Sequence, residues 1–278
     1  MPGLADIPGV EVHGKGTRDW TLPVGAVDET GKIQDQIILR EMKGEEDDMM
    51  GNDDLPIGER VSSVLTSCTE KLGDISDKGA IRAAIADEMK VGLPITEQDR
   101  IAAMVFLRRT SIGDTYKFER RCPRCGTLAE NRSTDLRTLT IEKSKHPERR
   151  RVQIKLPHSG HDCIVKVLTA QGAIEIGRLR PTTKELKSLA LVSRIESIDG
   201  KPIGEPQKAL QVVKDLPQAD RNFIRQTYNA MEAFVEDDIE VECRNPICLI
   251  SWTFKLDVGQ GFFLDLDSKL PPQDLKWL

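Results

Sequence analysis

The sequence predicts an α+β protein, with a helical part, an inserted β/α domain and a four-cysteine zinc ribbon split between distant parts of the chain. Apolar residues recur at helical spacing in several segments, and alternation marks several short strands. Four of the six cysteines form two close pairs. The chain has 278 residues, which is enough for one or two domains with a sizeable core.

Residues 1–35 are rich in glycine and proline and show no periodicity. We expect them to form an extended N-terminal arm with one short strand at residues 20–24. An arm of this composition cannot bury enough surface by itself, so it stays mobile or lies along a neighbouring molecule.

Residues 36–116 are expected to form the helical part. A short strand at 36–40 precedes an acidic helix start at 45–48, where carboxylates suit the positive end of the helix dipole. Apolar spacing predicts a helix over 57–72, with Cys68 on its apolar face as a small buried hydrophobe.

A further helix is predicted to begin at Thr96, the N-cap. Asp99, three residues later, can accept from the cap backbone N–H and complete a capping box. The helix should run to about residue 110, and a strand at 115–121 then leads to Cys122.

Residues 127–238 are expected to form the inserted β/α domain. Alternation at 151–156 and 163–168 predicts a hairpin, and helical spacing returns at 181–196 and 217–234. Between these two helices, Asp199 and Gly200 indicate a tight hairpin turn.

The split ribbon is expected to comprise residues 117–126 and 239–260, which place strand-like segments around each cysteine pair. Residues 261–278 then form a C-terminal docking tail. Its aromatic side chains, Phe262, Phe263 and Trp277, suit contact with a partner if they are exposed.

The segments that precede the two cysteine pairs are similar, which indicates an internal repeat. Cys122 lies 23 positions after Asp99, and Cys243 lies 23 positions after Asp220. Each aspartate is followed by arginine, an amphipathic helix, an acidic turn and a strand. A duplicated helix–strand–knuckle unit would bring the two cysteine turns together about a pseudo-twofold axis.

Cys122, Cys125, Cys243 and Cys248 are the predicted ligands of a structural Zn²⁺ ion. Spacings of two and four residues within the pairs suit chelation across a tight turn, and Gly126 permits a positive φ there. The insertion, residues 126–242, is far longer than in an ordinary ribbon. Four cysteine ligands leave no position for water, so the site should be structural rather than catalytic.

Other interpretations of these side chains remain open. Cys122 and Cys125 could form a thioredoxin-like redox pair or a disulfide, although Gly126 and the following strand do not suit the redox geometry. His158 and His161 could bind a second metal or simply occupy a polar loop. The acidic run at 45–54 could bind a metal, but it suits a solvated or partner-docking face better.

Composition argues against several classes of function. The chain has 40 Lys+Arg and 45 Asp+Glu, which gives no support to a broad nucleic-acid-binding surface. The basic run at 143–151 lacks interleaved aromatics and suits a solvated loop or an acidic partner. No apolar run is long enough to span a membrane, and residues 1–6 do not resemble a secretion signal. No catalytic constellation or phosphate-binding loop is evident, so we expect no enzyme.

Several short motifs follow one another along residues 33–265: Ile38-Leu39-Arg40-Glu41-Met42-Lys43-Gly44-Glu45-Glu46-Asp47, Gln98-Asp99-Arg100, Leu107-Arg108-Arg109, Ser111-Ile112-Gly113, Cys122-Pro123-Arg124-Cys125-Gly126, Ser197-Ile198-Asp199-Gly200, Asp220-Arg221, the second cysteine pair and Phe262-Phe263. In these motifs and their order the sequence resembles the T4-type baseplate protein family of contractile-tailed bacteriophages. The four-residue spacing within Cys243–Cys248 departs from the tighter pair of that family.

This resemblance implies a non-enzymatic structural subunit of the baseplate, at or near the hub, in the virion and assembled in the host bacterial cytoplasm. Its expected partners are other tail proteins (hub, wedge or tube subunits), in multiple copies within a symmetric assembly, without nucleic acid or a membrane span. Two alternatives remain: a tail-assembly factor absent from the mature particle, and a zinc-ribbon nucleic-acid-binding protein.

Overall fold

The computed structural model describes residues 18–179, 183–256 and 260–263, and these residues form an α+β fold of helices and antiparallel strands. The helices are α1 (Gly44–Met50), α2 (Ile57–Cys68), α3 (Lys78–Ala86), α4 (Glu97–Ser111), α5 (Ala170–Arg178), α6 (Thr183–Val192), α7 (Pro206–Asp215) and α8 (Gln218–Met231). The longer strands are β1 (Arg18–Val27), β2 (Ile33–Leu39), β3 (Thr69–Leu72), β4 (Thr115–Arg121), β5 (Leu128–Asp135), β7 (Arg151–Lys155), β8 (Asp162–Lys166), β9 (Ile195–Ile198), β12 (Asp238–Glu242) and β13 (Ser251–Lys255).

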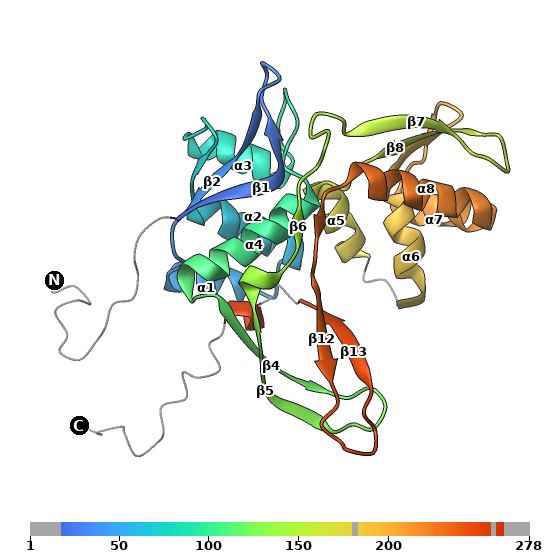
Figure 1. The fold of residues 1–278 in the computed structure, drawn as a ribbon. Helices are drawn as coiled ribbons and strands as arrows, with labels where there is room; N and C mark the ends of the chain where they lie inside the picture. The colour runs from blue at the N-terminus through green and yellow to red at the C-terminus, as the bar shows by residue number, and fades with distance from the viewer. Residues whose placement is uncertain (1–17, 180–182, 257–259, 264–278) are drawn as a thin grey trace, which may run out of the picture.

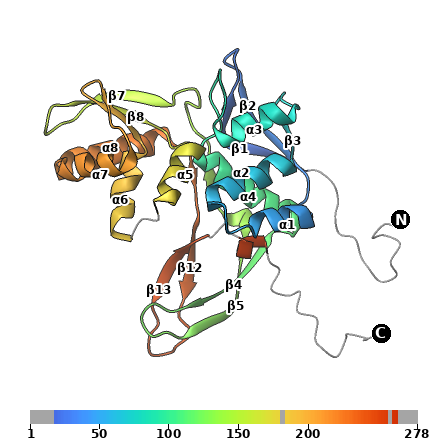
Figure 2. The same cartoon turned by 180° about the vertical axis from the view of Figure 1, so that it is seen from behind.

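Two bodies and a projecting arm make up the described chain, as Figures 1 and 2 show from opposite sides. The first body is the antiparallel sheet β1-β2-β3 with helices α1 to α4 packed around it. The second is the sheet β10-β9-β8-β7 with helices α6 to α8, where β10 is Lys201–Pro202. The arm consists of the hairpins β4–β5 and β12–β13, which meet side by side.

Each of these three parts has its own hydrophobic cluster. In the first body, Leu65 and Leu107 from two helices pack with Leu39 from the sheet. In the second body, Val165 and Ile224 lie in a separate cluster. Because the clusters are distinct, each part buries apolar surface without depending on the other two for most of its packing.

A short two-stranded ladder lies where the chain leaves and re-enters the first body. β6 (Ile141–Glu142) pairs with β11 (Phe234–Val235), and Val235 is buried in the cluster of the first body. The chain segments on either side of the second body are therefore hydrogen-bonded to each other, which brings residues far apart in sequence back to the arm.

The strand β1 corrects the expectation of an extended arm over residues 1–35. Residues 18–27 are a strand of the central sheet, with Leu22 and Ala26 fully buried. Pro23 and Gly25, which suggested irregular chain, lie where the register with β2 shifts. Gly25 has φ +81°, and a Cβ there would lie 2.6 Å from the carbonyl oxygen of Gln34. These residues therefore make a bulge in a buried strand; residues 1–17 lie outside the described chain.

Other expectations need smaller corrections. The helix predicted over 57–72 ends at Cys68, and β3 follows it as an edge strand of the sheet. The helix predicted over 181–196 likewise ends at Val192, before β9. In both cases a β-strand continues the apolar pattern directly after the helix, so periodicity alone runs the two elements together.

The structure also differs from the sequence-based expectation at the end of the first ribbon segment, residue 126, and in the expected C-terminal docking tail. β5 belongs to the arm through its pairing with β4, so the arm hairpin extends to Asp135. Phe262 is only 1% exposed, and its ring packs 5.3 Å from that of Tyr116. Phe262 is thus a core residue of the arm base rather than an exposed docking side chain; Trp277 lies outside the described residues.

Several predicted elements are confirmed. Thr96 and Asp99 form the capping box of α4, and β4 spans residues 115–121 as predicted. The hairpin β7–β8 is present, and Asp199 and Gly200 make the turn between β9 and β10 with positive φ values.

The two halves of the described chain share one order of elements. Each begins with a hairpin (β1–β2 or β7–β8) and two helices, followed by a strand that pairs antiparallel with the second hairpin strand. Two more helices and an arm hairpin with a cysteine turn then complete each half, and the second half has the additional short strands β10 and β11.

Candidate metal centre

The first cysteine turn joins β4 to β5. The Cys122 N–H donates to the Thr127 carbonyl at 2.9 Å, and the Gly126 N–H donates to the Cys122 carbonyl at 2.9 Å. Gly126 has φ +73°, a conformation that glycine adopts without steric cost. This closed turn directs the side chains of Cys122 and Cys125 to one side.

The second turn joins β12 to β13 and has a similar construction with a longer loop. The Cys243 N–H donates to the Ile250 carbonyl at 2.9 Å, and the Leu249 N–H donates to the Asn245 carbonyl at 3.2 Å. The Asn245 N–H also points at the Cys243 Sγ, at 3.4 Å. The two additional residues of this loop lie between its two cysteines, and the pair still converges on the first turn.

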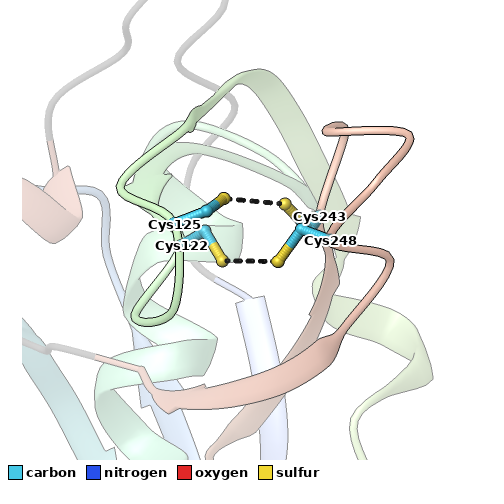
Figure 3. Close-up of side chains that lie close together, drawn as sticks. All are labelled: Cys122, Cys125, Cys243 and Cys248. Atoms are coloured by element: carbon cyan, nitrogen blue, oxygen red, sulfur yellow. Dashed lines mark hydrogen bonds between the residues drawn. The ribbon is translucent and has the colours of Figure 1, made fainter.

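The four sulfur atoms face one another across the two turns (Figure 3). Cys122 Sγ lies 3.8 Å from Cys248 Sγ, and Cys125 Sγ lies 3.6 Å from Cys243 Sγ. All four lie within 4.8 Å of one another. A tetrahedral site with metal–sulfur bonds of about 2.3 Å has sulfur–sulfur edges of about 3.8 Å. The cluster is therefore compatible with a metal site.

Aromatic packing brings the two hairpins together below the sulfurs. The rings of Phe118 and Phe254, one from each hairpin, meet edge to face at 4.9 Å. The Arg120 guanidinium lies over the Phe254 ring at 4.6 Å, and Arg132 donates to the Glu242 carbonyl at 3.1 Å. The protein itself thus holds the hairpins in register, and the cysteine pairs extend that contact to the tip of the arm.

The electrostatics of the cluster favour a bound cation. The Thr127 hydroxyl lies beside Cys125 and lowers the pKa of this thiol to about 6. The Asn245 amide acts to lower the pKa of Cys243, but burial and the neighbouring sulfurs raise it to about 12. Four adjacent thiolates repel one another, so their joint deprotonation requires a positive ion, and metal binding releases protons.

The cluster is half accessible to solvent. Cys122 and Cys243 are buried, Cys125 is exposed and Cys248 is intermediate. Three arginines of the same two turns (Arg121, Arg124 and Arg244) are exposed around it. A metal here would be within reach of a chelator from the side of Cys125.

The other candidate ligands do not join the cluster. Among the described residues, the four cysteines are the one group of three or more metal-ligating side chains with converging ligand atoms. Cys68 and Cys163 are buried in the two bodies, and burial raises the pKa of each thiol, to about 12 and about 11. His161 instead contacts Asp199, with its Nδ1 2.6 Å from the carboxylate.

The acidic run at 45–54 has a structural member that sequence reasoning did not distinguish. Glu46 is fully buried and accepts from Arg40 at 2.6 Å and from the Ser67 hydroxyl at 2.6 Å. The exposed carboxylates of the run do not converge on a common point in the described structure. Glu46 lies four positions, or about one helical turn, before the buried Met50. This spacing, which places both side chains on one face of the helix, is the sequence signal that could have distinguished Glu46 from the other acidic residues of the run.

Two aspartates that the repeat had singled out anchor the helices leading to the arm. Asp99 accepts backbone N–H groups of Val24 at 2.7 Å and Gly25 at 3.1 Å, besides capping α4. Asp220 accepts those of His158 at 2.7 Å and Ser159 at 3.0 Å. Both carboxylates thus attach an arm-leading helix to the first hairpin of its own half.

Comparisons with protein-family models, with curated proteins and with solved structures find no match to this chain. Within the described ranges, none of the helices combines the length and apolar character that crossing a bilayer requires.

Proposed function

We propose that this chain is a non-enzymatic structural subunit of a contractile phage-tail baseplate, at or near the hub, and that its four clustered cysteines hold a structural zinc ion. The observation that carries the metal part is the spacing of the four sulfurs from two chain-distant turns. The baseplate part rests on the resemblance of ordered motifs over residues 33–265.

The donor set favours zinc and a structural role. Four thiolates complete a tetrahedral shell, which leaves no position for a reacting water or substrate. Iron is the other metal that such a set accepts. Bound here, the ion would link the turn after β4 to the turn after β12, and thereby tie together segments separated by residues 126–242.

The residues that carry the resemblance contact one another in ways that suit a scaffold. Arg40 and Glu46 form an ion pair at 2.6 Å. The Met42 N–H donates to the Ser111 hydroxyl at 2.9 Å, and Arg109 pairs with Asp114 at 2.7 Å. These contacts hold segments of the first body together, which supports a structural role for the motifs.

We also propose that the two halves are copies of one ancestral unit. The shared order of elements and the matched roles of Asp99 and Asp220 support this proposal. The metal would then lie between two equivalent turns, near a pseudo-twofold axis. Such a site forms when a duplicated knuckle pairs with itself, which accounts for the long separation of the cysteine pairs.

The proposed location is the virion tail, after assembly in the host bacterial cytoplasm, with hub, wedge or tube subunits as neighbours in a symmetric multi-copy assembly. A tail-assembly factor that leaves the mature particle is the second candidate. Mass spectrometry of purified tails and of assembly intermediates separates the two, because a structural subunit is present in both and a factor only in the intermediates.

Metal analysis of the purified chain tests the metal proposal. We expect one zinc ion per chain, loss of the metal in Cys125→Ser, and retention in Ser251→Ala, a control at an exposed position of the same arm. A metal-free chain in which the four clustered cysteines are reduced would contradict the zinc proposal. A salt-dependent gel shift with DNA or RNA would instead support the nucleic-acid-binding alternative.

A further inference from the structure

The sulfur contacts of the candidate metal centre join one arm hairpin to the other. Cys122 Sγ contacts Cys248 Sγ at 3.8 Å, and Cys125 Sγ contacts Cys243 Sγ at 3.6 Å (Figure 3). We call these two sets of partners the cross-turn pairs, because each combines one cysteine of the β4–β5 turn with one of the β12–β13 turn. All four are free thiols in the structure. The contacts that suit a bound ion therefore also place the partners of two cross-turn disulfide bonds side by side.

The sulfurs of a cross-turn pair need little movement to form a bond. A disulfide holds its sulfurs about 2.0 Å apart, so each sulfur has to move by less than about 1 Å. Contacts that do not involve the cysteines keep the hairpins together, among them the Phe118–Phe254 ring contact at 4.9 Å and the hydrogen bond from Arg132 to the Glu242 carbonyl. The partners therefore remain neighbours while an ion is exchanged for a covalent bond.

Each cross-turn pair combines an accessible cysteine with a buried one. Cys125 is exposed and its partner Cys243 is buried; Cys248 is intermediate and its partner Cys122 is buried. A small oxidant reaches the accessible sulfur first, and a buried sulfur at contact distance can then complete the bond. This arrangement is the one that a pair of attacking and resolving cysteines requires.

The two remaining cysteines lack such an arrangement. Cys68 is fully buried in the cluster of the first body, and Cys163 is fully buried in that of the second. Since they lie in different clusters, neither has the other as a partner. Oxidation of the folded chain is therefore expected at four of its six cysteines.

We propose that the metal centre is also a disulfide-forming site, in which a small-molecule disulfide oxidises the four cysteines to the bonds Cys122–Cys248 and Cys125–Cys243. These bonds then replace the metal in holding the two arm hairpins together. The inference rests on the proposed function and adds a second state to its metal site. The proposed virion location supplies the setting, because thiols stay reduced in a bacterial cytoplasm whereas disulfides persist outside the cell.

Thiol–disulfide exchange with oxidised glutathione forms each bond in two steps. The Cys125 thiolate attacks one sulfur of the glutathione disulfide, breaks its S–S bond and releases one glutathione thiolate. The Cys243 thiolate then attacks Cys125 Sγ in the mixed disulfide and releases the second glutathione. Two electrons thus pass from the cysteine pair to the glutathione disulfide, and each released thiolate takes up a proton from water.

The second bond forms in the same way, with Cys248 as the accessible sulfur and Cys122 as its partner. Formation of both bonds converts two molecules of oxidised glutathione into four glutathione thiols. Because a disulfide sulfur is no longer a thiolate ligand, both bonds together leave the ion without ligands, and zinc is released.

Peptide mapping of the full-length chain, purified with zinc and then incubated with oxidised glutathione, tests the pairing. Trypsin cleaves after arginine, and the arginines at positions 121, 124 and 244 separate the four cysteines from one another. The peptides that contain them are residues 122–124, 125–132, 226–244 and 245–255. With free thiols alkylated before digestion, we expect the first peptide to be linked to the fourth and the second to the third. Free thiols should fall from six to two per chain as zinc is released.

Cys243→Ser tests the order of attack. Without its partner, Cys125 should retain one glutathione as a stable mixed disulfide, while Cys122 still bonds to Cys248. A Cys122–Cys125 bond in this variant would instead show that the first turn pairs internally. Ser251→Ala, at an exposed position of the same hairpin, is the matched control and should form both cross-turn bonds.

Amide hydrogen exchange tests whether the bonds take over from the metal. The zinc-free chain, kept reduced, should exchange the amides of β12 and β13 at least about tenfold faster than the zinc-bound chain. Oxidation of this zinc-free chain should restore the slow exchange, and reduction with dithiothreitol should abolish the protection again.

Three results would overturn the inference: bonds within each turn, six thiols that stay free in excess oxidised glutathione, or an oxidised arm that exchanges as fast as the reduced zinc-free arm. Cross-turn bonds in a chain that purifies without metal would support the inference and contradict the zinc proposal. A zinc-bound chain that forms bonds only within its turns would do the reverse, so the two proposals can fail separately.

Discussion

At the scale of single residues, buried carboxylates connect segments that are distant in sequence. One oxygen of Asp99 accepts from the Thr96 N–H at the start of α4, and the other accepts from the Val24 and Gly25 N–H groups of β1. A single side chain therefore fixes the start of a helix and its position on the sheet. Sequence reasoning could identify the capping half of this role but not the half that depends on β1.

Removal of either anchoring carboxylate should destabilise its own half. In Asp99→Ala, three buried N–H groups lose their acceptor, and we expect the free energy of unfolding to fall by about 3 kcal/mol. Asp220→Ala leaves two N–H groups unpaired and should cost about 2 kcal/mol. Urea denaturation measures both effects, and Asp215→Ala on a neighbouring helix end serves as a control. Equal stability of all three variants would contradict the anchoring role.

Glu46 should make stability depend on pH. Burial acts to raise its pKa, but hydrogen bonds from Arg40 and Ser67 prevail and lower it from 4.5 to about 2. Because the folded-state pKa lies below the unfolded value, this contribution is complete above about pH 5 and is lost as the pH falls towards 2. We expect Glu46→Gln to cost about 2 kcal/mol at pH 7 and much less near pH 2.

Denaturation of the wild type and Glu46→Gln at neutral and acid pH tests this dependence, with the exposed neighbour Glu45→Gln as the control. A stability difference that is the same at both pH values would show that the charge of Glu46 is not its source.

At the scale of elements, β1 shows how packing overrides local composition. Its proline and glycine reduce the local preference for a strand, yet six consecutive residues, 22–27, are buried. Pairing with β2 and contact with α4 supply the free energy that the local sequence lacks. The segment is therefore part of the core and not an arm.

Truncation distinguishes these two interpretations of the N-terminal region. Deletion of residues 1–30 removes β1 together with the buried Leu22 and Ala26, and exposes the apolar surface of β2 and α4. We expect an insoluble or unfolded product. Deletion of residues 1–17, which leaves β1 intact, is the matched control and should keep the thermal transition of the full chain. A folded product from the longer deletion would contradict the role assigned to β1.

At the scale of the whole molecule, the arm is where the two halves meet. Its hairpins come from the ends of α4 and α8, and its aromatic cluster is separate from those of the two bodies. A metal at the arm tip would therefore constrain the arm rather than support the folding of either body. The energy of metal binding would appear as resistance of the arm to local opening.

Metal removal should act on the arm in the same selective way. We expect a chelator, or Cys243→Ser, to increase amide hydrogen exchange in β12 and β13 by at least about tenfold, while the protected helices α2 and α8 change little. Hydrogen exchange followed by mass spectrometry measures each segment, with Ser251→Ala as the control. Uniform loss of protection throughout the chain would show that the site supports both bodies.

Local patterns were sufficient for those elements whose residues interact with near neighbours. The capping box at Thr96, the strand at 115–121 and the hairpin of β7 and β8 depend on spacing and turn residues that the sequence displays. The two cysteine pairs were identifiable for the same reason, because two residues in a tight turn already define half of a metal site.

By itself, then, the amino-acid sequence determined the α+β class, the capped helix start and the four candidate ligands. Only the tertiary structure decided that β1 is core, that Phe262 is buried, and that sulfurs separated by residues 126–242 lie within 4.8 Å of one another. These features depend on contacts between distant segments, whose free energy comes from surfaces buried together and is absent from any local stretch of chain.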